Sequence, residues 1–169
     1  MWKYIISVVL ALFLAPTVGL SKDLSSRLGV GISDQFAEVN GSSLPSVMVK
    51  YYPSMDLGFS AALAVDTEKD NSKFGFLVKM YKLLGGGFME DNLNFYMGGG
   101  AGLLSVEQSG ENDSGFELTG FAGAEFFFSG LENLGFSFEA GVGVVSISSE
   151  VRFRTIADHP FRAGITFYF

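Results

Sequence analysis

The chain ends on the stretch Phe161-Arg162-Ala163-Gly164-Ile165-Thr166-Phe167-Tyr168-Phe169. Its odd-numbered positions are all apolar, whereas the positions between them are Arg162, Gly164, Thr166 and Tyr168. Successive side chains of a strand point to opposite faces, so this alternation predicts one strand that meets a different environment on each side. Chain ends are usually polar and poorly ordered, so such an apolar ending indicates a docked element.

A last strand that stops on an aromatic residue resembles the C-terminal assembly signal of bacterial outer-membrane β-barrels. The apolar residues of the strand carry this resemblance: Phe161, Ala163, Ile165, Phe167 and Phe169. The resemblance implies that the barrel-assembly machinery is a partner of this chain.

The first 21 residues have a different character from the rest. A short start that contains Lys3 precedes a predominantly apolar run over residues 4–15, and small residues occur in 16–21. This pattern predicts a cleaved signal peptide over residues 1–21 and an exported barrel domain over residues 22–169. The apolar run is too short for a membrane-spanning helix. The chain has no cysteine, which excludes disulfides and a lipid-modified N-terminal cysteine.

The composition favours a membrane barrel. Hydrophobic residues make up 48% of the chain, yet no apolar run after residue 21 is long enough for a transmembrane helix. High apolar content without long apolar runs is what alternating strands of membrane barrels produce. The formal net charge of -7 argues against nucleic acid as a partner.

Eight alternating segments follow the signal peptide: 26–33, 44–52, 57–66, 73–83, 93–104, 116–128, 136–145 and 161–169. Polar and mostly longer connections are expected at 34–43, 67–72, 106–115 and 148–160, and turn-like ones at 53–56, 85–92 and 129–134. Long loops at one end and short turns at the other are the outer-membrane arrangement, with both termini in the periplasm. The sequence therefore predicts an all-β fold: an eight-stranded antiparallel up-and-down transmembrane β-barrel.

The volumes of the side chains decide which face points outward. An inward Phe, Leu and Val face would leave an exterior of Gly, Ser and Ala, which is a poor surface for water. The opposite assignment places the Phe-rich face in lipid and the small residues in an eight-stranded lumen, which has room only for side chains. Aromatic residues are then expected at the periplasmic rim: Tyr51, Phe128, Phe136, Phe167 and Phe169.

Charged residues on the small-residue face are expected to form a network in the lumen: Arg27, Lys50, Lys79, Glu117, Glu125, Glu139 and Arg162. Strand directions place Glu117 and Arg162 near the outer end and the other acidic residues nearer the periplasm, where we expect Glu139 to couple with Lys50 or Arg27. The network is either a gate or polar relay, or a set of pairs that neutralise one another in a low-dielectric interior. The second interpretation is favoured.

The remaining polar motifs do not indicate a catalytic, cofactor or metal site. His159, the single histidine, lies beside Asp158 in an expected loop without a placed nucleophile. Residues 66–70 carry alternating carboxylates but lack the glycine and the final acidic ligand of a calcium loop. The glycine runs at 98–102 and 141–143 lack the spacing of phosphate-binding loops and fit a tight lumen better. We expect neither a cofactor nor a metal.

The pattern of strands and loops over residues 22–169 resembles the small OmpA/OmpX-type barrels of Gram-negative bacteria. The resemblance implies a bacterial outer-membrane location, contact with outer-membrane lipid and lipopolysaccharide, and a structural or surface-interaction role through four extracellular loops. It does not imply an enzyme. We expect a non-enzymatic, monomeric barrel whose lumen is filled by side chains and is not a general pore. Two alternatives remain: a lipid A-modifying outer-membrane enzyme, and a soluble periplasmic barrel that binds an apolar ligand.

Overall fold

The computed structural model describes residues 22–39, 42–69, 72–84, 92–108, 111–147, 150–155 and 162–169. These residues form nine strands: β1 (Leu28–Val39), β2 (Ser42–Tyr51), β3 (Leu57–Asp66), β4 (Lys73–Leu84), β5 (Leu93–Gln108), β6 (Glu111–Phe127), β7 (Leu134–Ile147), β8 (Glu150–Thr155) and β9 (Arg162–Tyr168). They contain no helix that is long and apolar enough to cross a membrane, a finding that concerns helices alone. The predicted signal peptide lies outside the described residues.

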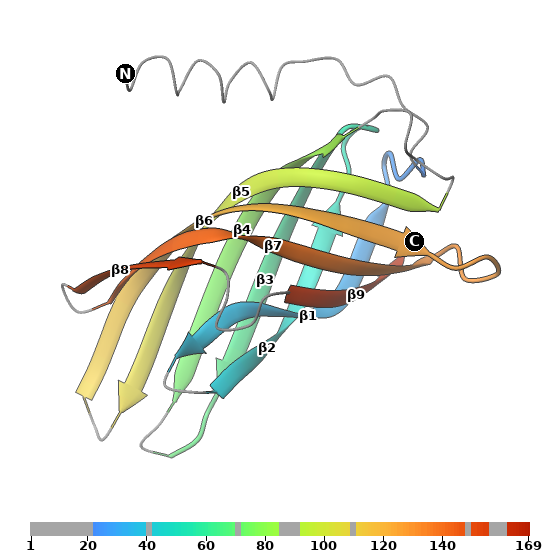
Figure 1. The fold of residues 1–169 in the computed structure, drawn as a ribbon. Coiled ribbons are helices and arrows are strands. Elements are labelled where there is room, and N and C mark those ends of the chain that lie inside the picture. The colour runs from blue at the N-terminus through green and yellow to red at the C-terminus, as the bar shows by residue number, and fades with distance from the viewer. Residues whose placement is uncertain are drawn as a thin grey trace, which may run out of the picture.

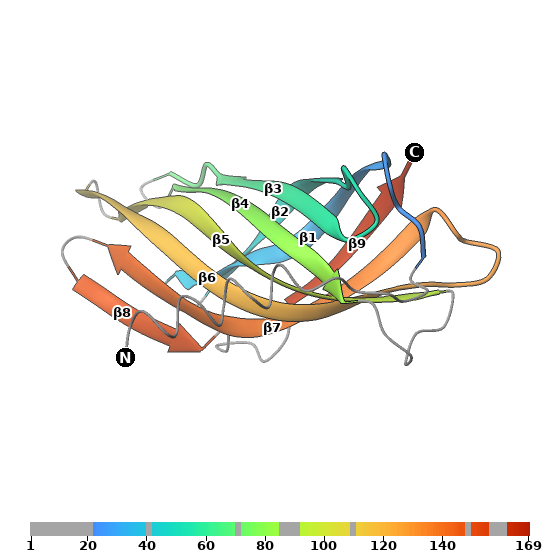
Figure 2. The ribbon, with the colours of Figure 1, turned by 90° about the horizontal axis from the view of Figure 1, so that it is seen from above.

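The strands close into a barrel (Figures 1 and 2). Each strand from β1 to β7 pairs antiparallel with the next, and β9 pairs with both β7 and β1, which completes the ring. β8 pairs with the last part of β7, and β9 with the first part of the same strand. Together β8 and β9 therefore occupy the eighth position of the wall. The predicted all-β, eight-stranded antiparallel barrel is confirmed.

Both ends of the described chain lie at one end of the barrel. The backbone N–H of Phe169 donates to the carbonyl of Leu28 at 2.9 Å, and Figure 1 shows the C-terminus beside the start of the chain's described part. We call this the terminal end and the opposite one the distal end. The predicted turn at 53–56 lies at the terminal end, and the one predicted at 129–134 lies there over 128–133. Most of the turn predicted at 85–92 lies outside the described residues.

The eighth wall strand is interrupted. Val142 of β7 pairs with Thr155 of β8, and Glu139 of β7 pairs with Arg162 of β9. The two pairs are therefore three residues apart on β7 but seven residues apart between β8 and β9. Figure 1 shows β8 and β9 as separate pieces. A single loop over 148–160 was predicted, and this prediction is wrong for β8.

The distal hairpins are longer than predicted. β1 continues to Val39, and β5 and β6 pair as far as Gln108 and Glu111, within segments that we predicted as loops. The hydrogen bonds between strands join backbone groups, so a segment of polar residues can form them as well as an apolar one. Apolar alternation marks only the part of a strand that contacts an apolar environment. The sequence pattern thus outlines the apolar belt and not the whole strand.

The apolar side chains point out of the barrel, as predicted. On β9 the inward positions are buried and the outward ones exposed in strict alternation, and β3 and β4 alternate in the same way over most of their length. Ile32 is 61% exposed and Leu103 60% exposed, while Lys50 and Lys79 are each 2% exposed. A water-soluble protein would have the opposite distribution. Ala163, Ile165, Phe167 and Phe169 all face outward, whereas Phe161 lies outside the described residues.

Aromatic rings cluster on the outer surface near the terminal end. Phe126 stacks on Phe136 with ring centroids 5.4 Å apart, and Phe128 meets Phe136 edge-on at 5.3 Å. On the last strand, Phe167 and Phe169 meet edge-on at 5.3 Å. Such offset and edge-on contacts add to the attraction between large apolar rings. Four of the five residues predicted for the rim, namely Phe128, Phe136, Phe167 and Phe169, therefore take part in ring contacts near the terminal end.

Placing Lys at Phe138 tests the outward face. This residue is 45% exposed in the apolar belt, so a charge there should destabilise the barrel in lipid by up to about 2 to 4 kcal/mol, depending on depth. Urea unfolding in lipid vesicles measures the loss. Phe138→Leu is the control, because it shortens the side chain but stays apolar. Equal stability of the Lys and Leu variants would contradict the assignment of this face to lipid.

Candidate functional site in the barrel lumen

Glu125 of β6 lies in the lumen near the terminal end, and three other side chains bond to it. Its side chain is fully buried, and its carboxylate accepts three hydrogen bonds. Lys50 Nζ donates to Oε1 at 2.9 Å, the Tyr168 hydroxyl to the same oxygen at 2.7 Å, and the Tyr52 hydroxyl to Oε2 at 2.9 Å. A buried carboxylate is tolerated when it is paired and hydrogen-bonded in this way.

A second buried pair joins Glu139 of β7 to Lys79 of β4. The ammonium of Lys79 bonds to Oε2 of Glu139, and the Tyr96 hydroxyl donates to Oε1 at 3.1 Å. The same ammonium lies 4.6 Å from the centroid of the Phe121 ring, within the range of a cation–π contact. From the sequence, Glu139 was expected to couple with Lys50 or Arg27. Its direct ion-pair partner is Lys79 instead, while Lys50 bonds to Glu125 and Arg27 to Asn133.

The third pair is closest to the distal end. Arg162 Nη2 lies 3.1 Å from Glu117 Oε1, and both side chains are buried. Three buried polar atoms have no hydrogen-bond partner among the described residues: Oε2 of Glu117, Nη1 of Arg162 and the hydroxyl oxygen of Thr166 on β9. Buried polar atoms of this kind usually bind ordered water.

Each of these pairs spans the lumen. Lys50 and Glu125 lie on β2 and β6, Lys79 and Glu139 on β4 and β7, and Arg162 and Glu117 on β9 and β6. In each pair the two strands are not neighbours in the sheet. Pairs on adjacent strands can be predicted from register, whereas pairs across the lumen depend on the curvature of the closed wall. This is why the inward face of these six residues, and the common level of Glu117 and Arg162, could be predicted from the sequence, whereas the direct partner of Glu139 could not.

Arg27 lies apart from the pairs. Its Nη2 donates to Oδ1 of Asn133 at 2.7 Å and its Nε to the carbonyl oxygen of Phe169 at 3.3 Å, both at the rim of the terminal end. Alternation in the sequence predicted that Arg27 would point into the lumen. The strand begins only at Leu28, and the preceding Ser26 has a φ of 62°, so the alternation does not extend to Arg27.

The residues before β1 pack into the terminal end of the lumen, a placement that was not predicted from the sequence. Leu24 is 1% exposed and packs in an apolar cluster with inward rings: Tyr52, Tyr81, Tyr96, Phe121, Phe127 and Tyr168. The backbone N–H of Lys22 donates to Asn94 Oδ1 at 2.8 Å, and that of Ser26 donates to the Tyr52 carbonyl at 2.7 Å. Partial burial lowers the pKa of the Lys22 ammonium, although nearby Glu132 opposes the shift. The feature of the sequence that could have indicated this packing is Leu24 itself, an isolated leucine in a polar segment.

Glycines make room for the tyrosine rings. A Cβ at Gly58 would lie 2.3 Å from the Tyr81 ring, and one at Gly29 would lie 2.7 Å from the ring of Tyr168. Tyr81 in turn packs against Tyr96 with centroids 5.2 Å apart. The lumen at this level is therefore filled with rings and ion pairs.

An apolar cluster lies beside the Arg162–Glu117 pair toward the distal end. It consists of the buried residues Met48, Ala62, Ala64, Leu77, Leu104 and Val145. Within the ranges that the structure describes, no group of three or more His, Asp or Glu side chains is placed to hold a metal ion. His159 and Asp158, the residues of the enzymatic alternative, lie outside those ranges, as do two positions of the carboxylate-rich loop after β3.

Closed topology, outward apolar side chains and cross-lumen ion pairs define an eight-stranded barrel of the membrane type. The fold is similar to a solved structure, the N-terminal β-barrel domain of Pseudomonas aeruginosa OprF. The TM-score is 0.54 at 13% sequence identity, over 86% of this chain and 98% of that one. No protein-family model and no curated protein sequence matches the chain. The likeness is therefore one of fold.

Reversing the charge at Glu139 tests the second pair. Glu139→Lys places two buried cations together, and we expect a loss of about 3 to 5 kcal/mol of folding stability, or failure to fold. Adding Lys79→Glu restores opposite charges and should recover a large part of the loss. Urea unfolding in lipid vesicles measures each variant.

The matched control is Lys50→Glu in the Glu139→Lys background. It makes the same change of charge at an equally buried lysine, but Lys50 bonds to Glu125, so no recovery is expected. Equal recovery by the two second-site changes would contradict the specific pairing of Glu139 with Lys79.

Removing the Tyr168 hydroxyl tests the first pair. Tyr168→Phe deletes one of three donors to a buried carboxylate and should cost about 1.5 to 3 kcal/mol. Tyr81→Phe is the matched control, because its hydroxyl is buried in the same ring cluster but donates to no carboxylate in the described part of the chain. Unfolding in urea should show the smaller loss for Tyr81→Phe, and equal losses would count against the assigned role of Tyr168.

Proposed function

We propose that this chain is a non-enzymatic, monomeric outer-membrane β-barrel of the OmpA/OmpX type, with a structural or surface-interaction role. The observation that carries the proposal is the inverted distribution of side chains, with an apolar belt outside and buried ion pairs inside a closed wall. Only an apolar surrounding makes that distribution favourable, and membrane barrels have it. Residues 1–21 act as the signal peptide that exports the chain.

The terminal end faces the periplasm and the distal end faces outward. Support comes from the hairpins, since the β5–β6 ladder continues past the apolar belt to Gln108 and Glu111, while the turn after β6 is short. Extended hairpins at the outer end and short periplasmic turns are typical of such barrels. The distal connections then contact lipopolysaccharide and surface partners, and the C-terminal strand is the part that the assembly machinery binds.

The lumen is not a general pore in this proposal. Leu24 and the tyrosine rings close it near the terminal end, and the Lys79–Glu139 and Arg162–Glu117 pairs cross it farther along. An eight-stranded wall leaves space for side chains and not for a channel. Closure by several independent layers supports a barrel that anchors its loops without conducting solutes.

The two alternatives receive less support. A soluble barrel that binds an apolar ligand needs an apolar interior and a polar exterior, which is the reverse of the arrangement of Phe138 and Glu139. A lipid A-modifying enzyme would depend on His159 or another loop nucleophile. Loss of a lipid-modifying activity on His159→Ala would favour the enzyme.

Membrane fractionation combined with a denaturing gel tests the proposal. The protein should be found with the outer membrane, and the unboiled sample should migrate differently from the boiled one, because a closed barrel resists unfolding in detergent. Recovery in the soluble periplasmic fraction, without a shift on boiling, would refute the proposal.

Planar-bilayer recording tests the closed lumen separately. Pure protein should give little or no steady ion conductance. A stable, large conductance would show that the layers at Leu24 and the ion pairs do not close the barrel, and would replace the structural role with that of a pore.

A further inference from the structure

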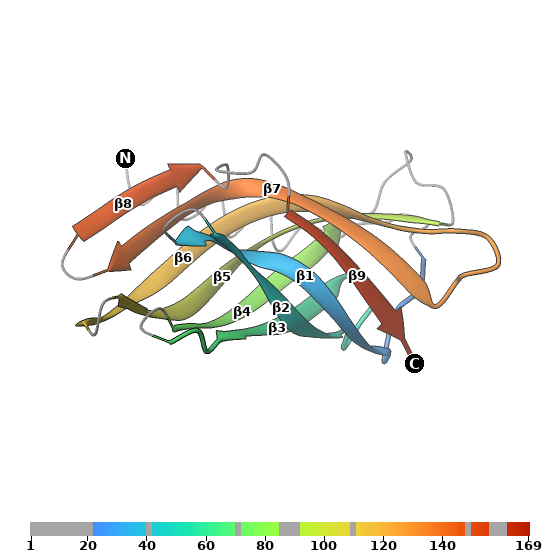
Figure 3. The same cartoon turned by 90° about the horizontal axis from the view of Figure 1, so that it is seen from below.

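The segment before β1 lies across the terminal mouth of the lumen. Lys22 bonds to Asn94 of β5, whereas Arg27 bonds to the carbonyl of Phe169 and to Asn133 in the turn after β6. Counted around the wall, β5 is four strands from β1 in either direction. Figures 2 and 3 show this part of the chain, in blue, beside the C-terminal end of β9. We call residues 22–26 the strap.

A buried side chain of the wall holds the backbone of the strap. Asn94 is 1% exposed, and its carboxamide makes two bonds to Lys22: it accepts from the backbone N–H at 2.8 Å and donates to the carbonyl oxygen at 3.3 Å. The ammonium of Lys22 lies 4.2 Å from the centroid of the Phe127 ring. A carboxamide that bonds to both polar groups of one residue binds peptide backbone in the way that a neighbouring strand does.

Leu24 is the side chain that the mouth receives. It is 1% exposed and packs among inward rings that include Tyr52, Tyr81 and Tyr168. Its neighbours Asp23 and Ser26 are exposed. Backbone bonds that hold a segment, combined with a pocket for one of its side chains, are the two features by which peptide-binding sites recognise their ligands.

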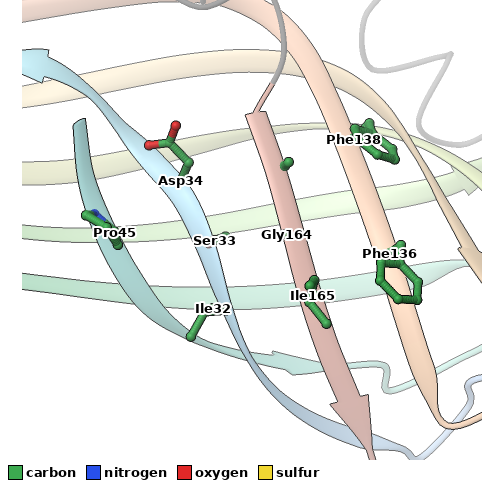
Figure 4. Close-up of a pocket in the computed structure, with 9 residues that line it drawn as sticks. Ile32, Ser33, Asp34, Pro45, Phe136, Phe138, Gly164 and Ile165 are labelled. Atoms are coloured by element: carbon green, nitrogen blue, oxygen red, sulfur yellow. The ribbon is translucent and has the colours of Figure 1, made fainter. Parts of the chain in front are cut away.

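The outer surface also has a groove, which is lined by Ile32 of β1, Ile165 of β9 and Phe136 of β7 (Figure 4). The walls of this groove belong to the apolar belt. The terminal mouth differs from it because the mouth combines a buried carboxamide with a cluster of rings. It is therefore suited to a peptide and not to a purely apolar ligand.

The strap is held by few contacts. Where it joins β1, the N–H of Ser26 donates to the carbonyl of Tyr52 at 2.7 Å. Its N-terminal side is held by Asn94 and by the burial of Leu24. These contacts oppose the entropy of ordering five residues, and the opposing free energies are of similar size. A segment in this balance can open locally while the strands of the wall stay paired.

We propose that the terminal mouth is a peptide-binding site, which residues 22–26 occupy as a strap that can be exchanged for another peptide with a leucine at the same place. The inference rests on the proposed function, in which this end faces the periplasm and the signal peptide is removed. Removal after residue 21 leaves the nitrogen of Lys22 as an ammonium, which donates to Asn94 as the amide does. The ion pairs farther along the lumen stay in place when the strap leaves, so the exchange uncovers a site without opening a pore.

A tryptophan reporter at Phe127 measures whether the strap is in place. Trp2 is the sole tryptophan of the chain, so Trp2→Phe gives a silent background, and Phe127→Trp keeps an aromatic ring beside Lys22. Full-length variants are folded in detergent micelles, and acrylamide in the water quenches the reporter when the strap leaves. Phe127 is 3% exposed, so little quenching is expected while the strap is bound.

Two substitutions should release the strap. Leu24→Ser removes the buried side chain and should raise the open fraction by about tenfold or more, because that is the value of burying a leucine. Asn94→Ala removes both bonds to Lys22 and should raise it by about fivefold or more. Leu131→Ser is the matched control, since Leu131 is 53% exposed in a turn at the same end of the barrel.

Free peptide distinguishes a binding site from a loosened chain end. The peptide Lys-Asp-Leu-Ser-Ser has the sequence of residues 22–26, and it should protect the reporter of the Leu24→Ser variant from acrylamide. The peptide Lys-Asp-Ser-Ser-Ser should need about tenfold more or higher concentrations for the same protection, because it lacks the leucine.

Unchanged quenching in both Leu24→Ser and Asn94→Ala, or equal action of the two peptides, would overturn the proposed binding site. The same samples are run unboiled on a denaturing gel. A retained shift shows a folded barrel, so that the strap proposal alone fails, whereas loss of the shift in the reporter protein itself refutes the closed barrel and the strap together. If Leu24→Ser does not fold, Asn94→Ala carries the quenching test.

Discussion

The burial of three carboxylates in the lumen is the constraint on which the rest of the barrel depends. Glu125 is fully buried and needs donors from β2 and β9 as well as from the turn after β2. Those donors reach it only when the wall is closed and the strands are in this register. An unpaired charge in the interior would cost several kcal/mol, so the ion pairs strongly favour one arrangement of strands.

The width of the lumen follows from the same requirement. An eight-stranded wall is narrow enough for a lysine on β4 to reach a carboxylate on β7, and the rings of Tyr96 and Phe121 contact the two charged groups. Rings of this size fit because glycines such as Gly58 face them. The glycine-rich strands are therefore a consequence of packing large polar side chains into a small barrel, and need no ligand to explain them.

Alternation predicts the faces of the strands but not the contacts across the lumen. Phe138 and Glu139 could be assigned to opposite faces from the sequence, because side chains repeat with a period of two. The partner of Glu139 could not be assigned from the sequence, since Lys79 is not on an adjacent strand. Leu24 has no periodic context, so its place in the closed end is a tertiary effect. β8 was missed because its two arginines resemble a loop composition.

The interruption of the eighth strand leaves the side chains of β9 on the same faces that an unbroken strand would give them, because the register shifts by an even number of residues. An uninterrupted continuation from the Val142–Thr155 pair would place residue 158 opposite Glu139, but Arg162 is there, a shift of four residues. An even shift leaves each side chain on its original face, whereas an odd shift would move every one to the other. With an odd shift, Arg162 and Tyr168 would point into lipid and the phenylalanines into the lumen. The C-terminal strand therefore keeps its apolar outer face, and Glu117 and Glu125 keep their partners, despite the break in the wall.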